Sequence, residues 1–220
     1  MPPVTNVPGK VDFTLYLITD RNCTAGKPLV SVVRQALDGG ARVVQLREKD
    51  LTGRELFALA RELRSITRDY GARLIINERL DIAMAVEADG VHIGAGSIPL
   101  AIARQLLGEK RLIGYSAHAV EEAGQAETDG ADFITFGPVY FTPSKAEYGT
   151  PQGIAMLAET AARVSIPVFA LGGVKNSTIP EVMAAGAAGI ALISAVMAEN
   201  DPKGAAISLL KTLEQHVTTT

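Results

Sequence analysis

Residues 167–194 read PVFALGGVKNSTIPEVMAAGAAGIALIS, and this stretch decides the fold. It contains two short apolar runs, Pro167–Leu171 and Gly189–Ile193, with a helical pattern over Ile179–Ala185 between them. Runs this short, rich in Val, Ile and Leu and joined by a helix, are typical of parallel strands buried on both faces. The glycine at position 186 suits the left-handed residue that ends a helix. The stretch therefore predicts a βαβ unit.

The same unit recurs along the whole chain. The six other predicted strands are Leu15–Thr19, Val43–Arg47, Arg73–Asn77, Gly90–Ile93, Arg111–Ser116 and Asp132–Gly137. The seven other predicted helices are Leu29–Asp38, Gly53–Asp69, Leu80–Glu87, Ile98–Leu107, Val120–Thr128, Ile154–Val164 and Pro202–Gln215. Eight strand–helix units without a linker predict one α/β domain over residues 1–220, a single (β/α)8 TIM barrel. We expect residues 1–10 to form a loosely ordered N-terminal extension.

An open doubly wound sheet is the competing fold. Such a sheet would usually have fewer strands and a glycine-rich fingerprint directly after the first strand. Here the first strand ends in ITDR at 18–21, and the GAG at 94–96 lacks both the third glycine and the downstream acid. The sequence therefore favours the barrel and gives little support to dinucleotide binding.

Composition narrows the class of protein. A chain of 220 residues removes roughly 70% of its unfolded surface from water on folding, so a large core is feasible. The net charge of −3 gives no general attraction to nucleic acid or to an anionic membrane. Cys23 is the only cysteine, which excludes an intrachain disulfide, and no apolar run is long enough for a membrane helix. We expect a cytoplasmic protein without nucleic-acid or membrane partners.

The carboxyl ends of the strands are the candidate active site, because barrel enzymes place their site there. The second strand ends in QLREK at 45–49, and strand alternation points Gln45, Arg47 and Lys49 the same way if the strand extends that far. One amide and two cations suit a diphosphate, which a guanidinium can bind in bidentate fashion. The alternative is an exposed loop in which these cations pair with the neighbouring acids at 48 and 50.

The third and fifth strands end in further polar residues. Asn77 and Glu78 offer oxygen ligands that could hold Mg²⁺ beside a diphosphate, whereas Arg79 and Asp81 read better as an ion pair at a helix start. The fifth strand ends in GYSAH at 114–118, with a hydroxyl at Ser116 and an imidazole at His118. His118 could move a proton near neutral pH. His92, inside a strand, and His216, in the tail, attract no catalytic role.

The last strands suggest a second anion site. The loop after the sixth strand contains Thr142, Ser144 and Lys145 and reads as a lid that closes on an anion, or else as a solvated loop. The glycine pair at 172–173 and the Ile193-Ser194 turn would let backbone amides approach a phosphate, which barrels often bind after strands seven and eight. Two phosphate regions on opposite sides of one mouth are therefore expected.

These segments, taken in order, resemble the thiamin phosphate synthase family. The most specific are QLREK (45–49), GYSAH (114–118), GPVY (137–140), TPSK (142–145) and LGG (171–173), within a resemblance from 16 to 195. The resemblance implies a transferase of the thiamine-phosphate pyrophosphorylase type. Such an enzyme couples hydroxymethylpyrimidine diphosphate to thiazole phosphate with Mg²⁺ and releases diphosphate, so the implied partners are a phosphorylated pyrimidine and a phosphorylated thiazole. A homodimer is compatible with this reading.

The resemblance also implies residue roles by position. The diphosphate would be held by Gln45, Arg47, Lys49, Asn77, Ser116 and Lys145. The thiazole phosphate would be held by Thr142, Ser144, the Gly173 amide and the turn formed by Ile193 and Ser194. The implied catalytic residues are Arg47, Lys49, Ser116, His118 and Lys145. Cations and Mg²⁺ would stabilise charge that grows on the leaving group, so neither a general base nor a covalent nucleophile is required.

Two positions depart from the family pattern. Glu78 and Ser97 stand where family members usually carry aspartates that bind Mg²⁺; Glu78 could still coordinate a metal, but Ser97 is neutral. These departures resemble the related thiazole tautomerases, in which the residue matching His118 is the proton shuttle. Lys49 and the 142–145 loop favour the synthase, which is our leading prediction. The tautomerase is the alternative, followed by a non-catalytic binder of thiamin intermediates.

Overall fold

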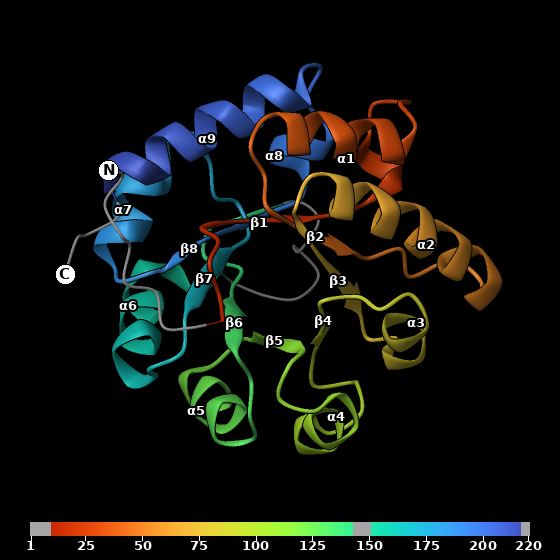
Figure 1. The fold of residues 1–220 in the computed structure, drawn as a ribbon. Helices are drawn as coiled ribbons and strands as arrows, with labels where there is room; N and C mark the ends of the chain where they lie inside the picture. The colour runs from red at the N-terminus through yellow and green to blue at the C-terminus, as the bar shows by residue number, and fades with distance from the viewer. Residues whose placement is uncertain (1–9, 143–150, 217–220) are drawn as a thin grey trace, which may run out of the picture.

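A computed structural model describes residues 10–142 and 151–216 and shows one closed barrel of parallel strands inside a ring of helices (Figure 1). The strands follow one another around the barrel in sequence order, and β1 pairs with β8 to close it. The predicted (β/α)8 barrel is therefore confirmed. Residues 1–9 of the predicted N-terminal extension lie outside the described residues.

The strands match their predicted positions within one residue at each end. They are β1 (Leu15–Ile18), β2 (Val43–Leu46), β3 (Arg73–Asn77), β4 (Gly90–Ile93), β5 (Leu112–Ala117), β6 (Phe133–Phe136), β7 (Val168–Leu171) and β8 (Gly189–Leu192). Because β2 ends at Leu46, the alternation that was to align Gln45, Arg47 and Lys49 stops before Arg47. The loops must therefore position those two cations.

The helices form the outer layer. They are α1 (Leu29–Asp38), α2 (Gly53–Asp69), α3 (Leu80–Ala85), α4 (Leu100–Leu107), α5 (Val120–Thr128), α6 (Gly153–Arg163), α7 (Ile179–Ala184), α8 (Ser194–Met197) and α9 (Pro202–His216). Two short 3₁₀ turns, Arg21–Cys23 and Asn176–Thr178, lie in the loops after β1 and β7. The prediction missed α8, whose four residues are too few to show helical periodicity. No helix in the described ranges is long and apolar enough to cross a membrane.

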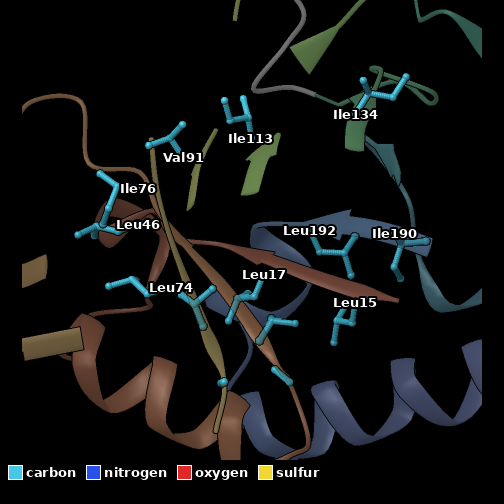
Figure 2. Close-up of a cluster of buried hydrophobic side chains, with 14 of the residues drawn as sticks. Leu15, Leu17, Leu46, Leu74, Ile76, Val91, Ile113, Ile134, Ile190 and Leu192 are labelled. Atoms are coloured by element: carbon cyan, nitrogen blue, oxygen red, sulfur yellow. The ribbon is translucent and has the colours of Figure 1, made fainter. Parts of the chain in front are cut away.

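Strand alternation divides the core into two parts. Residues such as Leu15 and Leu17 lie on the helix side of β1 and join the large apolar layer between sheet and helices (Figure 2). The alternate residues fill the barrel itself, where Tyr16, Phe133 and Phe169 are fully buried. Phe13, which precedes β1, stacks on Phe169 with ring centroids 5.1 Å apart and packs against the amino end of this interior. The barrel interior near the amino ends of the strands is thus filled mainly by aromatic side chains.

Glycine makes room for this interior. A Cβ on Gly114 would lie 2.4 Å from both the His92 Nδ1 and the Phe133 Cζ. Any larger residue on β5 at this level would force the two rings apart, since overpacking a close-packed core costs about 1–3 kcal/mol. The glycine therefore allows an imidazole and a phenyl ring to share one layer, below the carboxyl ends of the strands.

Candidate active site

The loops after β1 and β2 are locked together by Glu48. This carboxylate is only 4% exposed, and it accepts hydrogen bonds from the Thr19 hydroxyl at 2.7 Å and the Arg21 amide at 3.1 Å. Arg21 also forms a two-pronged ion pair with Asp50, which lowers the pKa of that carboxyl. The acids at 48 and 50 are therefore partnered by Arg21, and the alternative in which they pair with Arg47 and Lys49 is wrong.

Arg47 is held by its backbone, and its side chain is left available. Its amide donates to the Thr19 hydroxyl oxygen at 3.0 Å. Within the described ranges, the side chains of Arg47 and Lys49 make no hydrogen bond or ion pair. Arg47 is half-buried and its charge acts on His92 in the barrel interior, whereas Lys49 is exposed. A half-buried guanidinium without a counter-charge is suited to an anion.

Gln45 lies deeper than the sequence pattern indicated. Its side chain is 1% exposed, and its amide nitrogen donates to the Tyr16 hydroxyl at 2.7 Å. The Tyr16 oxygen lies 3.3 Å from the Nδ1 of His92, and the Nε2 of His92 lies 3.0 Å from the Ser116 hydroxyl. Thr135 lies 3.3 Å from the same Nε2. These residues form a polar layer directly above the aromatic rings of the barrel.

Sequence reasoning missed Tyr16, His92 and Thr135 as members of this layer. Each occupies a strand position that alternation turns inward, so the signal was a polar residue between apolar neighbours on strands that are otherwise apolar. Burial and the charge of Arg47 lower the pKa of His92 to about 3. His92 is therefore neutral at physiological pH.

His118 is exposed at the end of β5, and its ring is anchored at one nitrogen. The Nδ1 lies 2.5 Å from the Gly137 carbonyl, and because a carbonyl can only accept, Nδ1 is the donor. The His118 amide donates to Glu122 at 2.7 Å. In the neutral ring, the lone pair is consequently on Nε2. That atom is the one available for proton transfer.

The end of β3 presents two oxygen donors. Asn77 is half-buried and Glu78 is exposed, and neither side chain has a hydrogen-bond or ion-pair partner among the described residues. Glu78 has a φ of 58°, a strained left-handed conformation for a residue with a side chain. Arg79 and Asp81 form the predicted ion pair, with 2.6 Å between Nη2 and Oδ2. Ser97 instead closes the turn after β4, accepting from the Gly94 amide at 3.4 Å.

On the opposite side of the mouth, after β7, glycines bring the backbone to the surface of the candidate site. Gly172 and Gly173 have φ values of 94° and 67°. A Cβ on Gly172 would lie 2.6 Å from the Pro138 Cβ, and one on Gly173 would lie 2.7 Å from the Tyr140 Cβ. The glycine pair therefore lets the loop after β6 pack against β7, a reason beyond the predicted approach of an anion. The Gly173 amide donates to no acceptor in the described part of the chain.

The turn after β8 completes this side. Ile193 caps the short helix α8, which begins at Ser194, and the first amide groups of a helix have no partner within it. Thr142 ends the described part of the β6 loop and has a polar partner of its own. Ser144 and Lys145 lie outside the described residues. Since β3 and β7 face each other across the ring (Figure 1), the two predicted anion regions lie on opposite sides.

Comparisons with known proteins identify the family of the chain. The chain is 59% identical over 204 residues to a Geobacter sulfurreducens protein whose name assigns it provisionally to thiamine-phosphate synthase, covering 93% of this chain and 96% of that protein. It is 42% identical to the thiamine-phosphate synthase of Clostridium novyi, covering 90% and 98%. A solved structure, the thiamine phosphate pyrophosphorylase from Pyrococcus furiosus, superposes with a TM-score of 0.84 at 38% identity, covering 93% of this chain and 97% of that chain.

The family comparison covers most of the barrel. The model of the thiamine monophosphate synthase family matches residues 15–196, from the first residue of β1 into α8. Both sides of the mouth therefore fall inside the matched region, and none of the three relatives above is named a tautomerase. The chain belongs to the thiamine monophosphate synthase family.

Proposed function

We propose that this protein is a cytoplasmic thiamine-phosphate synthase that joins hydroxymethylpyrimidine diphosphate to thiazole phosphate. In this reaction the bond between the pyrimidine methylene carbon and the diphosphate oxygen breaks, and the diphosphate leaves with the electron pair. The thiazole ring nitrogen then forms the new C–N bond with that carbon. No electrons are gained or lost overall. The observation that carries the proposal is the mouth itself, where the Arg47 guanidinium and the Gly173 amide lie on opposite sides and neither has a partner among the described residues.

The diphosphate is assigned to the β2, β3 and β5 side. Arg47 and Lys49 supply positive charge, and Ser116 supplies a hydroxyl at the edge of the barrel interior. Charge that grows on the leaving oxygens is stabilised by donors already in place, which is the largest catalytic effect in many enzymes. Gln45 would support this group from the barrel interior, where its side-chain amide donates to the Tyr16 hydroxyl. Lys145, outside the described residues, is assigned to the same group.

The family also implies Mg²⁺, and the residues present fit a modest site. Mg²⁺ commonly takes one or two carboxylates together with waters and substrate phosphates. Glu78 and Asn77 offer a carboxylate and an amide oxygen that are unpaired among the described residues, whereas Ser97 is engaged in its own turn. We assign Glu78 and Asn77 as the holders of the ion. When bound there, Mg²⁺ would neutralise charge on the diphosphate.

The thiazole phosphate is assigned to the β7 and β8 side. The amides of Gly173 and of the turn at Ile193 and Ser194 would bind it, as phosphates commonly bind after these strands in barrels. Thr142 would contribute from the β6 loop, and Ser144, outside the described residues, would join it. This placement brings the thiazole nitrogen toward the pyrimidine carbon from across the mouth.

The tautomerase alternative rests on His118, whose Nε2 can accept a proton. One assay separates the two functions. Incubation with both substrates and Mg²⁺ should release diphosphate. The reaction as written needs no proton transfer at the reacting carbon, so the predicted catalytic role of His118 belongs to the tautomerase alternative, and His118→Asn should retain much of the release. No release, together with His118-dependent isomerisation of the thiazole carboxylate phosphate, would replace the synthase with the tautomerase.

A further inference from the structure

A chain of four polar side chains runs from the barrel interior to the mouth. The Gln45 amide nitrogen is 2.7 Å from the Tyr16 oxygen, which is 3.3 Å from the His92 Nδ1, and the His92 Nε2 is 3.0 Å from the Ser116 hydroxyl. Tyr16, Gln45 and His92 are at most 4% exposed. The proposed function uses Ser116 at the end of this chain and the link between Gln45 and Tyr16, but it gives no role to His92.

The hydrogen bonds of this chain have one direction. Burial raises the pKa of the Tyr16 hydroxyl, which therefore keeps its proton. Its oxygen accepts from Gln45, so the proton is directed to the His92 Nδ1. A neutral imidazole has one donor and one acceptor nitrogen, and if Nδ1 accepts, the ring proton is on Nε2.

The side chains around His92 fit that tautomer. The ring packs against the Tyr16 and Phe133 rings and lies within hydrogen-bond distance of the hydroxyls of Ser116 and Thr135. No carboxylate among the described residues forms a hydrogen bond with the ring. The Nε2 proton is then donated to Ser116, the closer of the two hydroxyls. Because the Ser116 oxygen accepts this hydrogen bond from His92 in the barrel interior, the hydroxyl proton of Ser116 is left to point into the mouth.

We propose that His92 is a positioning residue that holds Ser116 as a hydrogen-bond donor toward the leaving diphosphate. The inference rests on the proposed function in one respect, that Ser116 contacts the diphosphate. The opposite tautomer would turn Ser116 around, since its hydroxyl would then donate to Nε2 and present lone pairs to the anion. Donors linked in series also polarise one another, which strengthens the last bond of the chain.

The tautomer can be observed without any ligand. The chain has three histidines, so ¹⁵N-histidine labelling of the full protein gives three rings, which the variants His118→Gln and His216→Gln assign. Correlation spectra recorded near neutral pH should show the His92 ring proton on Nε2. Tyr16→Phe removes the group that fixes Nδ1 as the acceptor and should produce a mixture of tautomers. A proton on Nδ1 in the wild-type protein would overturn the inference.

Binding of inorganic diphosphate with Mg²⁺, measured by calorimetry, tests the consequence. Ser116→Ala should weaken binding about tenfold or more, as expected for a lost hydrogen bond to a charged group. His92→Leu should weaken it about three- to tenfold, through the unlinked Ser116 hydroxyl. His92→Gln, which can place an amide N–H near the former Nε2, should restore binding to within about twofold of wild type. In the Ser116→Ala background, His92→Leu should have no further effect.

The outcomes separate this inference from the proposed function. If Ser116→Ala leaves diphosphate affinity unchanged, the placement of the diphosphate fails. If Ser116→Ala weakens binding but His92→Leu does not, or if the two effects add fully, the placement stands and the positioning role of His92 is wrong. Should His92→Leu fail to fold, Tyr16→Phe takes its place in the cycle, and the wild-type tautomer remains a direct test.

Discussion

The two sides of the barrel mouth offer different groups to an anion: side chains on one side and backbone amides on the other. On the β2–β5 side, the proposed anion would meet side chains, among them Arg47, which is half-buried and whose amide is held by Thr19 next to the buried Glu48. On the β7–β8 side, the proposed anion would meet backbone amides such as that of Gly173, which has no acceptor among the described residues. The first side should therefore be sensitive to loss of charge and of hydrogen-bond partners. The second should be sensitive to the addition of a single carbon atom.

The largest effect should come from Gly173→Ala. The new Cβ would lie 2.7 Å from the Tyr140 Cβ at a φ of 67°. Backbone strain of about 1–2 kcal/mol and overpacking of about 1–3 kcal/mol should both lower the free energy of unfolding. The KM for thiazole phosphate should rise as the loop shifts. Urea unfolding and steady-state kinetics measure the two effects.

Gly71→Ala is the matched control for that change. Gly71 has a φ of 61°, and nothing lies within 4 Å of its added Cβ, at the far end of the barrel between α2 and β3. It should show the strain alone, about 1–2 kcal/mol, with both KM values unchanged. Equal losses of stability and affinity in the two variants would mean that close packing at Gly173 has no part in building the phosphate side.

The next effect is loss of charge at Arg47. Arg47→Ala should weaken diphosphate binding by about 2 kcal/mol or more, which is about thirtyfold, because a charge-assisted contact is lost. Arg79→Ala is the charge-matched control at the end of β3, where the guanidinium is already paired with Asp81. Calorimetry with inorganic diphosphate should show a much smaller loss for Arg79→Ala. Similar losses in both variants would reduce the role of Arg47 to general charge.

A smaller effect should follow from the lock beneath Arg47. Thr19→Val keeps the shape of a buried residue but removes the acceptor for the Arg47 amide and a donor to Glu48. Stability should fall by about 1–3 kcal/mol, and diphosphate binding should weaken several-fold. Thr160→Val is the control, since among the described residues that fully buried hydroxyl bonds only to the Met156 carbonyl within α6. It should leave diphosphate binding unchanged; a comparable loss there would contradict the positioning of Arg47 by Thr19.

The smallest effect, counted per pH unit, is the loss of folding stability in acid that His92 contributes. Its pKa is about 3 in the folded protein, below the ordinary value of 6.5, so the unfolded chain binds more protons between these limits. Stability contributed by the neutral ring should therefore fall as pH drops from 6.5 toward 3, by up to about 1.4 kcal/mol per pH unit. The difference in unfolding free energy between wild type and His92→Gln, followed against pH, isolates this slope. A constant difference would contradict it.

Periodicity and glycine placement were enough to predict the barrel and its eight strands. They were not enough for α8, which is four residues long, or for the buried partners of the site, because pairing depends on distances across strands. Glu48 illustrates the limit: a charged residue in a loop reads as exposed, yet Thr19 and Arg21 supply the donors that let it be buried. His92 was set aside because it lies inside a strand, although alternation turns it into the barrel.

The proposed enzyme binds two anions on opposite sides of one mouth, one through side chains and one through backbone amides. The most direct test is to measure both KM values in Arg47→Ala and in Gly173→Ala, by following diphosphate release. Arg47→Ala should raise the KM for the pyrimidine diphosphate and leave that for thiazole phosphate near the wild-type value, and Gly173→Ala should do the reverse. If both variants raise the same KM, or raise both equally, the two sides are not separate sites.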